Sequence, residues 1–569
     1  MPFISNRPLQ PGKAFALSTL GPHGVAWWLN LIFVGMALSL HQPATAEEPQ
    51  RILPRGIPGT LWLAGGGEFP SELRETFCKL AGAKEANLVI IPTASSRSDE
   101  TKDWQTWLEP WQKSELGSTH VLHIEEGSQP DKEDQQLLEN ATAIWFSGGR
   151  QDRLASRIVG TRWEKLVMDI LNRGGLVGGT SAGAAIQSKI MIARGNPIPE
   201  ISQGLDLLPD AIVDQHFTQR GRQGRLSQAI LKNPDRFGLG IDEGTAVIVR
   251  GRTMFAVGKG SATIVLAQTD ARPEATWSIS QGERADLTAI RRMVANRSTS
   301  DFPHGFAHSP VLKSGALIIV GGGGLPESVT EKFIELAGGQ DSHIVVLPTA
   351  APDPLPQRHG IAELFRRAGA GTVTVLPQRE KEEVESEAFL KTLDEATGIW
   401  FGGGRQWRFV DAYANTEAEK AFHRLLERGG VIAGSSAGAS IQGEYMARGN
   451  PLGNLDIMSE GYEKGLGFLP GVAIDQHFTQ RSRMKDMKAL VKTYPQFLGI
   501  GIDETTAILV EGTKATVMGK NDVYFLSAAT QDSESDRDLE SSIDQLSEGG
   551  VYDLEKKEII VEAKPDSSE

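Results

Sequence analysis

The chain of 569 residues carries the same succession of short signals twice, about 256 residues apart. L-W-L-A-G-G-G at 61–67 corresponds to L-I-I-V-G-G-G at 317–323, and I-W-F-S-G-G-R-Q at 144–151 corresponds to I-W-F-G-G-G-R-Q at 399–406. This period is too long for a solenoid and indicates that one domain has been duplicated. The sequence must therefore fold as two similar domains.

Apolar runs of four to six residues alternate with amphipathic stretches in each copy. The pattern predicts helices over residues 69–82, 161–173, 327–338 and 417–428. Continuous apolar strands that alternate with helices are typical of a parallel sheet covered on both faces. We therefore expect the α/β class with mostly parallel sheets, and ligands beyond the carboxyl ends of the strands.

The composition of the sequence predicts where the signal peptide, the domains and the linker begin and end. Residues 1–46 combine an early positive charge, an apolar run of 16 residues and an A-T-A site, which predicts a secretory signal peptide and an exported or periplasmic protein. An uncleaved membrane anchor is the alternative, although the run is short for a membrane span. We expect the first domain over 51–294, a polar linker over 295–310, the second domain over 311–561 and an acidic tail over 562–569.

The G-x-S-x-G motif occurs in both copies, at residues 179–183 and 434–438. Each motif follows a short apolar run that opens with two glycines, and each precedes a run of small residues. A strand, a sharp turn and a helix form the context in which this motif presents a nucleophilic serine. Ser181 and Ser436 are therefore the candidate nucleophiles.

The segment D-Q-H-F-T-Q-R is identical in both copies and follows an apolar strand each time. Its histidines, His216 and His477, are candidate general bases for the serines. A glutamate follows each histidine by 27 residues, within G-I-D-E. These residues, Glu243 and Glu504, are candidates for orienting the imidazoles.

Backbone N–H groups near each serine can stabilise the oxyanion of an acyl transfer. The candidate donors are Ala182, Gly148 and Gly149 in the first copy, and Ala437, Gly403 and Gly404 in the second. The arginines after each histidine can grip a substrate carboxylate or serve as solvated helix charges. They are Arg220, Arg222 and Arg225 in the first copy and Arg481 and Arg483 in the second.

The composition argues against several other functions. The net charge of −14 does not favour binding to a nucleic-acid backbone. One cysteine, Cys78, allows neither an intramolecular disulfide nor a cysteine metal cluster. The histidines show no H-E-x-x-H spacing, so the sequence predicts no zinc site and no cofactor.

With these motifs the chain resembles the family of serine peptidases that contains cyanophycinase and dipeptidase E. The resemblance rests on G-T-S-A-G-A, D-Q-H-F-x-Q-R-x-R and G-I-D-E-x-T-A and covers both copies. It implies two three-layer domains like class I glutamine amidotransferases (flavodoxin-like), Ser-His-Glu triads and no metal. It also implies cleavage next to aspartyl residues. Cyanophycin is poly-aspartate with an arginine on each side chain, from which the family's exo-enzyme releases β-Asp-Arg dipeptides.

The resemblance further implies which residues line the substrate groove. They are Gln151, Asp214, Gln215 and the three arginines in the first copy, and Gln406, Asp475, Gln476 and the two arginines in the second. The second copy departs from the pattern because Asp486 stands where Arg225 would be. We expect this aspartate to repel a substrate carboxylate and to make the first copy dominant on cyanophycin.

Two other functions fit the same residues. One is a secreted dipeptidase for other aspartyl or isoaspartyl peptides, and the other is a binding protein with relic sites. Single-copy relatives often pair as dimers, so the tandem chain is a candidate covalent pseudo-dimer, without stable membrane association after signal cleavage.

Overall fold

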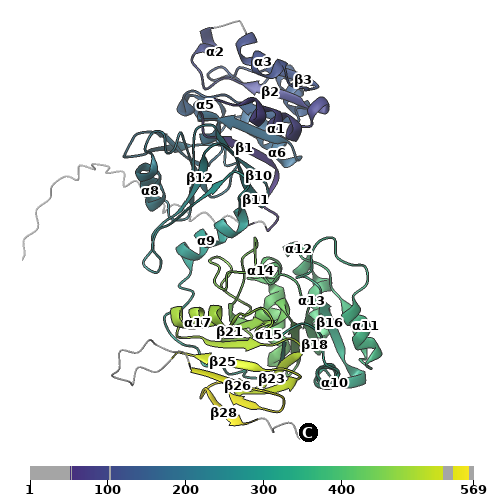
Figure 1. Cartoon of the computed structure of the whole chain (residues 1–569). Helices are drawn as coiled ribbons and strands as arrows, with labels where there is room; N and C mark the ends of the chain where they lie inside the picture. The colour runs from purple at the N-terminus through teal and green to yellow at the C-terminus, as the bar shows by residue number, and fades with distance from the viewer. Residues whose placement is uncertain (1–51, 53, 101–103, 529–541, 563–569) are drawn as a thin grey trace, which may run out of the picture. The chain divides into compact units, whose positions relative to one another are not determined.

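The computed structural model describes residues 52, 54–100, 104–528 and 542–562 (Figure 1). The described residues from Ile52 onward belong to one compact unit. The predicted signal peptide lies outside the described residues, as do residues 563–569 of the predicted acidic tail. No helix within the described ranges is long and apolar enough to cross a membrane.

The first copy contains two sheets and the helices around them. Its strands are β1 (Ile57–Ala64), β2 (Asn87–Ile91), β3 (Ser118–Val121), β4 (Ala143–Phe146), β5 (Leu176–Thr180), β6 (Ile190–Arg194), β7 (Glu200–Gln203), β8 (Ala211–Gln215), β9 (Phe237–Ile241), β10 (Thr245–Gly251), β11 (Thr253–Gly258), β12 (Ser261–Leu266), β13 (Ala275–Ser280) and β14 (Arg284–Asp286). Its helices are α1 (Ser71–Ala81), α2 (Arg97–Glu100), α3 (Gln105–Gln112), α4 (Lys132–Asn140), α5 (Gln151–Ile158), α6 (Arg162–Asn172), α7 (Ala182–Ala185), α8 (Gln223–Lys232) and α9 (Leu287–Thr299), with the 3-10 turn η1 (Ala83–Glu85).

The second copy repeats this order with local differences. Its strands are β15 (Ala316–Val320), β16 (His343–Leu347), β17 (Thr372–Val375), β18 (Gly398–Phe401), β19 (Val431–Ser435), β20 (Gly443–Met446), β21 (Leu469–Gln476), β22 (Leu498–Ile502), β23 (Thr506–Glu511), β24 (Lys514–Gly519), β25 (Val523–Ser527), β26 (Ser542–Leu546), β27 (Val551–Asp553) and β28 (Glu558–Val561). Its helices are α10 (Glu327–Leu336), α11 (Gly360–Arg367), α12 (Lys381–Val384), α13 (Glu387–Glu395), α14 (Trp407–Tyr413), α15 (Glu417–Glu427), α16 (Ala437–Ser440) and α17 (Met484–Thr493), with the 3-10 turn η2 (Gly339–Asp341).

The large sheet of the first copy has the order β14-β11-β10-β1-β5-β4-β2-β3. The five strands from β1 to β3 in this order are parallel, as predicted, whereas β10, β11 and β14 form an antiparallel flank that the sequence analysis did not single out. The second copy repeats the arrangement in the order β17-β16-β18-β19-β15-β23-β24-β27-β28. The predicted α/β class is therefore confirmed, and each large sheet combines a parallel part with an antiparallel flank.

Alternating side chains of the central strand β1 pack on opposite faces of the sheet. Trp62 joins α1 and α3 in one core cluster, through Phe77 and Trp111. Leu61 and Leu63 join α4, α5, α6 and the smaller sheet in another. Because successive residues of a strand point to opposite faces, one apolar run supports both layers. This packing produces the predicted three-layer domain.

A smaller sheet accompanies each large one. It has the order β13-β12-β9-β8 in the first copy and β20-β21-β22-β25-β26 in the second. The parallel pair β8–β9, like β21–β22, ends close to the end of the central strand, because the N–H of His216 donates to the carbonyl of Gly65 just after β1 at 2.7 Å. The small sheet thus delivers residues to the carboxyl edge of the large one.

The predicted helices are confirmed as α1, α6, α10 and α15, each within two residues of its predicted ends. The predicted boundary at residue 294 differs from the structure, because α9 continues to Thr299 and enters the expected linker. The small and polar residues from 296 onward looked like linker composition, yet Asp286 caps the helix and Val294 and Arg297 are buried.

Ion pairs join the two copies within the compact unit. Arg252 binds both Asp286 of its own copy and Asp411 of the second, at 2.6 and 2.7 Å. Arg292 also binds Asp411, and the hydroxyl of Tyr462 donates to the same carboxylate at 2.8 Å. These largely buried contacts favour the pseudo-dimer expectation, which stays a prediction.

Candidate active site

Each candidate serine occupies a strained turn between a strand and a short helix. Ser181 follows β5 and precedes α7 with φ 53° and ψ −110°, and Ser436 follows β19 with φ 57° and ψ −113°. An added Cβ on Gly179 would lie 2.4 Å from the carbonyl oxygen of Gly183. The turn therefore needs glycine at that end of G-x-S-x-G, and its strain is typical of a functional site.

The two predicted histidines and glutamates lie in line with these serines. In the first copy, Ser181 Oγ is 2.9 Å from His216 Nε2, and His216 Nδ1 is 2.5 Å from Glu243 Oε1. The second copy repeats this chain of hydrogen bonds through Ser436, His477 and Glu504, at 2.9 and 2.6 Å. A base within hydrogen-bond reach of the serine, itself oriented by a carboxylate, is the arrangement that activates a hydroxyl nucleophile.

The glycines after the central strand hold the imidazole and the glutamate. A Cβ on Gly66 would lie 2.3 Å from His216 Cε1, and a Cβ on Gly67 would lie 2.9 Å from Glu243 Cβ. The corresponding distances in the second copy are 2.3 Å at Gly322 and 2.5 Å at Gly323. The position of these glycines after a strand in both copies fits the expectation of ligands beyond the carboxyl ends of the strands, although the sequence did not assign them individual roles.

Burial lowers the pKa of both histidines below the ordinary value. For His216 the loss of hydration outweighs the hydrogen bond to Glu243, and the charge of Arg220 acts in the same direction. For His477 the balance is the same, with Glu504 and Arg481 in the corresponding roles. A lowered pKa keeps each imidazole neutral near pH 7, as a general base requires.

The glycine loops after β4 and β18 lie beside the serines. A Cβ on Gly148 would be 3.6 Å from Ser181 Cβ, and the value for Gly403 and Ser436 is also 3.6 Å. Gly149 and Gly404 continue these loops with positive φ. Ala182 and Ala437 open the short helices after the serines, where N–H groups have no intrahelical acceptor. The structure thus brings all six predicted oxyanion residues to the two sites.

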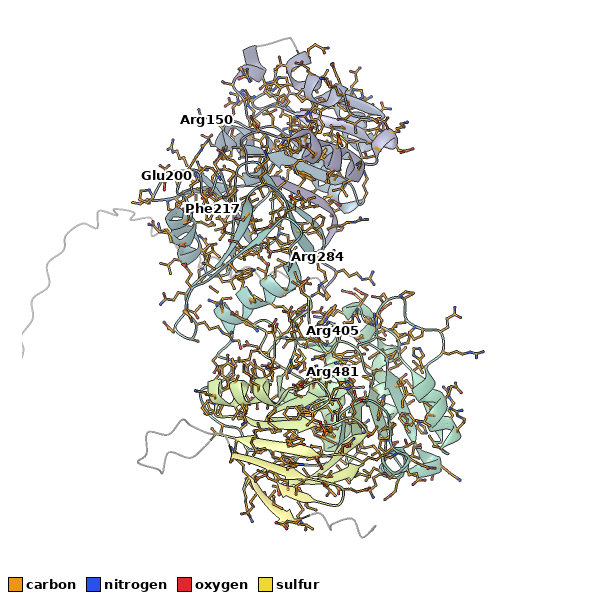
Figure 2. All side chains as sticks on the ribbon, viewed as in Figure 1. Arg150, Glu200, Phe217, Arg284, Arg405 and Arg481 are labelled. Atoms are coloured by element: carbon orange, nitrogen blue, oxygen red, sulfur yellow. The ribbon has the colours of Figure 1, made fainter. Side chains whose placement is uncertain are left out.

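The glutamines predicted to line the groove donate hydrogen bonds to backbone carbonyls of neighbouring segments. Gln151 Nε2 donates to the carbonyl of Ile192 at 2.9 Å, and Gln406 Nε2 donates to Ala447 at 2.7 Å. Figure 2 labels Arg150 and Arg405, the residues before them. Both glutamines therefore connect the glycine loops to the segment that follows α7 or α16.

The predicted arginines divide into exposed and buried residues. Arg220 and Arg481 are exposed, and Figure 2 labels the latter. Arg225 is 3% exposed, and its guanidinium binds Asp214 rather than facing solvent, with Nε 2.8 Å from Oδ2. This placement differs from the expectation of a guanidinium open to substrate carboxylates, because the completely buried Asp214 side chain needs a cation.

Arg222 and Arg483 occupy equivalent positions. Arg222 donates to the carbonyl and the side chain of Gln215, and Arg483 Nη1 donates to the Gln476 carbonyl at 2.6 Å and to Asp475 at 2.8 Å. Each arginine thus fixes the peptide just before the histidine. Burial lowers the pKa of Arg483 to about 10, which leaves it charged at neutral pH.

Asp486 is not the free repelling charge that the sequence analysis expected. Its carboxylate lies 2.7 Å from a guanidinium nitrogen of Arg448, a residue that the sequence analysis did not consider. The argument for first-copy dominance therefore cannot rest on direct repulsion by this aspartate.

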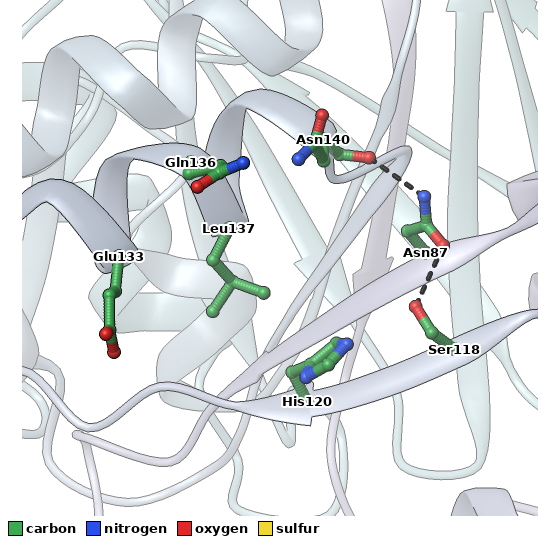
Figure 3. A pocket seen from close by; sticks show the side chains of 7 residues that line it. All are labelled: Asn87, Ser118, His120, Glu133, Gln136, Leu137 and Asn140. Carbon is green, nitrogen blue, oxygen red and sulfur yellow. Dashed lines mark hydrogen bonds between the residues drawn. The ribbon is translucent and has the colours of Figure 1, made fainter.

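One pocket on the first copy lies away from the serine (Figure 3). Asn87 and Ser118 begin β2 and β3, so the pocket opens at the amino ends of parallel strands, whereas Ser181 follows a carboxyl end. Its volume is about 440 Å³, and it is lined by Asn87, Ser118, His120, Glu133, Gln136, Leu137 and Asn140. Within the described part of the chain, no group of three or more His, Cys, Asp or Glu residues is placed to hold a metal ion.

Comparison with known proteins gives the class. The model of peptidase family S51 matches residues 61–257 and 317–518, one match in each copy. These matches cover well over half of the chain, so it belongs to peptidase family S51 and is a serine-type peptidase, duplicated in tandem.

Relatives of known name match stretches of this chain about as long as one copy. The cyanophycinase of Geminocystis herdmanii is 35% identical over 219 residues, which are 36% of this chain and 79% of that protein. The cyanophycinase of Trichormus variabilis is 31% identical over 225 residues, 38% of this chain and 75% of that protein. A crystal structure of a peptidase from an acI-B1 Actinobacterium is similar at 22% identity and a TM-score of 0.33, covering 42% of this chain and 97% of its own.

Proposed function

We propose that this peptidase hydrolyses aspartyl peptide bonds with two Ser-His-Glu triads and releases β-Asp-Arg-type dipeptides from a cyanophycin-like polymer. The observation that carries the proposal is the hydrogen-bonded chain from Ser181 through His216 to Glu243, repeated from Ser436 to Glu504. The cyanophycinases that match this chain support the choice of substrate.

The proposed reaction begins when His216 Nε2 takes the proton of Ser181 as Oγ attacks the carbonyl carbon. Backbone N–H groups of Ala182 and the Gly148–Gly149 loop then stabilise the oxyanion. The C–N bond breaks, the amine leaves with the proton from the imidazolium, and an acyl-enzyme remains. Water, deprotonated by the same imidazole, hydrolyses the ester. Glu243 holds the ring in the required tautomer and stabilises its charged form.

The proposal is tested by incubating the purified protein separately with cyanophycin, with α-Asp dipeptides and with isoaspartyl dipeptides. We expect release of β-Asp-Arg from cyanophycin, with little hydrolysis of α-Asp dipeptides. Efficient hydrolysis of free aspartyl or isoaspartyl dipeptides with intact cyanophycin would instead favour a dipeptidase. Binding without hydrolysis of any of the three would favour a binding protein with relic sites.

We also propose that the protein is exported with cleavage after Ala46, because of the apolar run and A-T-A in the sequence. N-terminal sequencing of the protein from its own cells tests this proposal. We expect a mature chain that starts at Glu47, and an uncleaved chain recovered from the cytoplasm would contradict export.

A further inference from the structure

Two buried aspartates lie two residues before the catalytic histidines. The side chains of Asp214 and Asp475 are both 0% exposed. A carboxylate without water needs cationic partners and good hydrogen bonds, since an unpaired buried charge is strongly destabilising. Each aspartate has two guanidinium partners, and one of them, Arg222 or Arg483, comes from the same place in both copies.

The second partner comes from different places. In the first copy it is Arg225 on α8, which binds both oxygens of Asp214 and donates to the carbonyl of Gly195 at 2.7 Å. The corresponding residue on α17 is Asp486, which cannot play this role. In the second copy Arg448 binds Asp475 instead, with Nε 2.9 Å from Oδ2.

Arg448 makes the same kinds of contacts as Arg225. Its side chain is 2% exposed, and Nη1 donates to the carbonyls of Asn454 and Leu455 at 3.1 and 2.7 Å. In each copy the guanidinium thus joins a buried aspartate to the loop after β6 or β20. Asp486 completes the group by binding Arg448 Nη2 at 2.7 Å.

When the two copies are aligned by sequence, Arg448 does not correspond to Arg225. The segment A-R-G-N-P occurs at 193–197 and at 447–451, so Arg194 is its counterpart. Arg194 is 74% exposed and pairs with Glu200 on the surface. The side chains of Arg194 and Arg448 point in different directions because the preceding strands pair differently. Strand β6 pairs with β7 in a separate hairpin, whereas β20 joins the small sheet beside β21.

We propose that Arg448 is the positioning residue of the second active site, where it replaces Arg225 by holding Asp475 and the loop of residues 449–455. Asp475 precedes Gln476 and His477 in the chain, so holding Asp475 in place also fixes the position of the His477 imidazole. The same loop accepts hydrogen bonds from Arg405 at Asn450 and Gly453, and Arg405 precedes Gln406 in the glycine loop beside Ser436. Arg448 therefore supports both the base and the oxyanion loop.

The exchange also changes the charge of the site. Asp214 with two arginines leaves one excess positive charge, whereas Asp475 with Asp486 and two arginines is neutral. The second site thus offers less positive charge to the carboxylates of a substrate, without any repulsive contact from Asp486. This inference rests on the proposed serine catalysis.

A fluorophosphonate reagent tests the proposal, because it labels an activated serine without requiring the natural substrate. Peptide mapping gives separate labelling rates for Ser181 and Ser436 in the full chain, so the first copy is an internal standard. We expect Arg448→Ala to slow labelling of Ser436 by tenfold to 100-fold, as small misplacements of catalytic groups do. Labelling of Ser181 should stay within about twofold.

The decisive variant is Arg448→Ala combined with Asp486→Arg, which restores the arrangement of the first copy. We expect it to recover the rate at Ser436 to within about fivefold of wild type. Arg448→Lys keeps the charge but lacks the fork that joins Asp475 to the loop, so it should lower kcat more than it raises KM. Arg194→Ala is the matched control and should leave both rates unchanged.

Two results would overturn the proposal. One is unchanged labelling of Ser436 in Arg448→Ala, and the other is a loss that Asp486→Arg does not recover. Wild-type protein that is labelled at neither serine would contradict the proposed serine catalysis itself, so the two failures are distinguishable.

Discussion

The two histidines show how one residue's surroundings set its chemistry. Burial and a nearby arginine depress the pKa of each imidazole, while the glutamate partly opposes them. The neutral ring is the form that accepts the serine proton. Activity should therefore persist at pH values below 6.5, the ordinary pKa of histidine, and fall as the pH drops through the lowered pKa.

Arg220→Gln, made in a Ser436→Ala background, should move this acidic limb to higher pH. Removing the cation makes the charged imidazole of His216 less unfavourable, so its pKa rises. The pH profile of fluorophosphonate labelling at Ser181 measures the shift and avoids any effect on substrate binding. An acidic limb that stays in place or moves to lower pH would contradict this account of His216.

At the scale of elements, the loop after the central strand sets the site as much as the serine turn does. Gly66 has φ 100° and contacts the ring of His216. Gly66→Ala should therefore displace the imidazole and lower kcat/KM of the first copy about 100-fold. Gly174→Ala is the matched control, because Gly174 has φ 90° and nothing within 4 Å of an added Cβ.

Both substitutions place an alanine at positive φ, which should cost about 1 kcal/mol of stability, and Gly66→Ala should cost more because its Cβ overlaps the imidazole. Only the first should affect hydrolysis, measured with Ser436→Ala in the background. Equal activity of the two variants would show that the contact between this glycine and the imidazole is unimportant.

Much of the fold and of the site was predictable because the same motifs occur in both copies, which makes a chance match improbable. Helices α6 and α15 were predicted from the amphipathic period of their sequences. Both serine turns were predicted from the spacing of glycines after an apolar strand. Arg448 was not predictable, because A-R-G-N-P is identical in both copies and only the pairing of β20 with β21 turns its arginine inward. Only the structure shows that Arg448 takes the role of Arg225 in the second copy, where Asp486 occupies the corresponding position of the sequence.

At the scale of the whole molecule, buried ion pairs join the two copies. Asp411 receives Arg252, Arg292 and the Tyr462 hydroxyl, and its side chain is 7% exposed. Asp411→Asn should remove the carboxylate that Arg292 binds in a buried place, while Arg252 keeps its pair with Asp286. The cost should be about 3–5 kcal/mol.

Thermal unfolding of Asp411→Asn measures this loss as a lowered Tm. Asp394→Asn is the control, since its pair with Arg424 is about half exposed and should contribute at most about 1 kcal/mol. Equal Tm values for Asp411→Asn and wild type would contradict a stabilising role for the contacts between the copies.

The most direct test of the central claim is cyanophycin hydrolysis by the variant that carries both Ser181→Ala and Ser436→Ala. The account predicts that release of β-Asp-Arg becomes undetectable while Tm changes little, because each substitution removes one hydroxyl from a rigid turn. Of the single variants, Ser181→Ala should lose more activity than Ser436→Ala, since the first site has the excess positive charge. Hydrolysis by the double variant at a rate close to that of wild type would contradict serine catalysis in this chain.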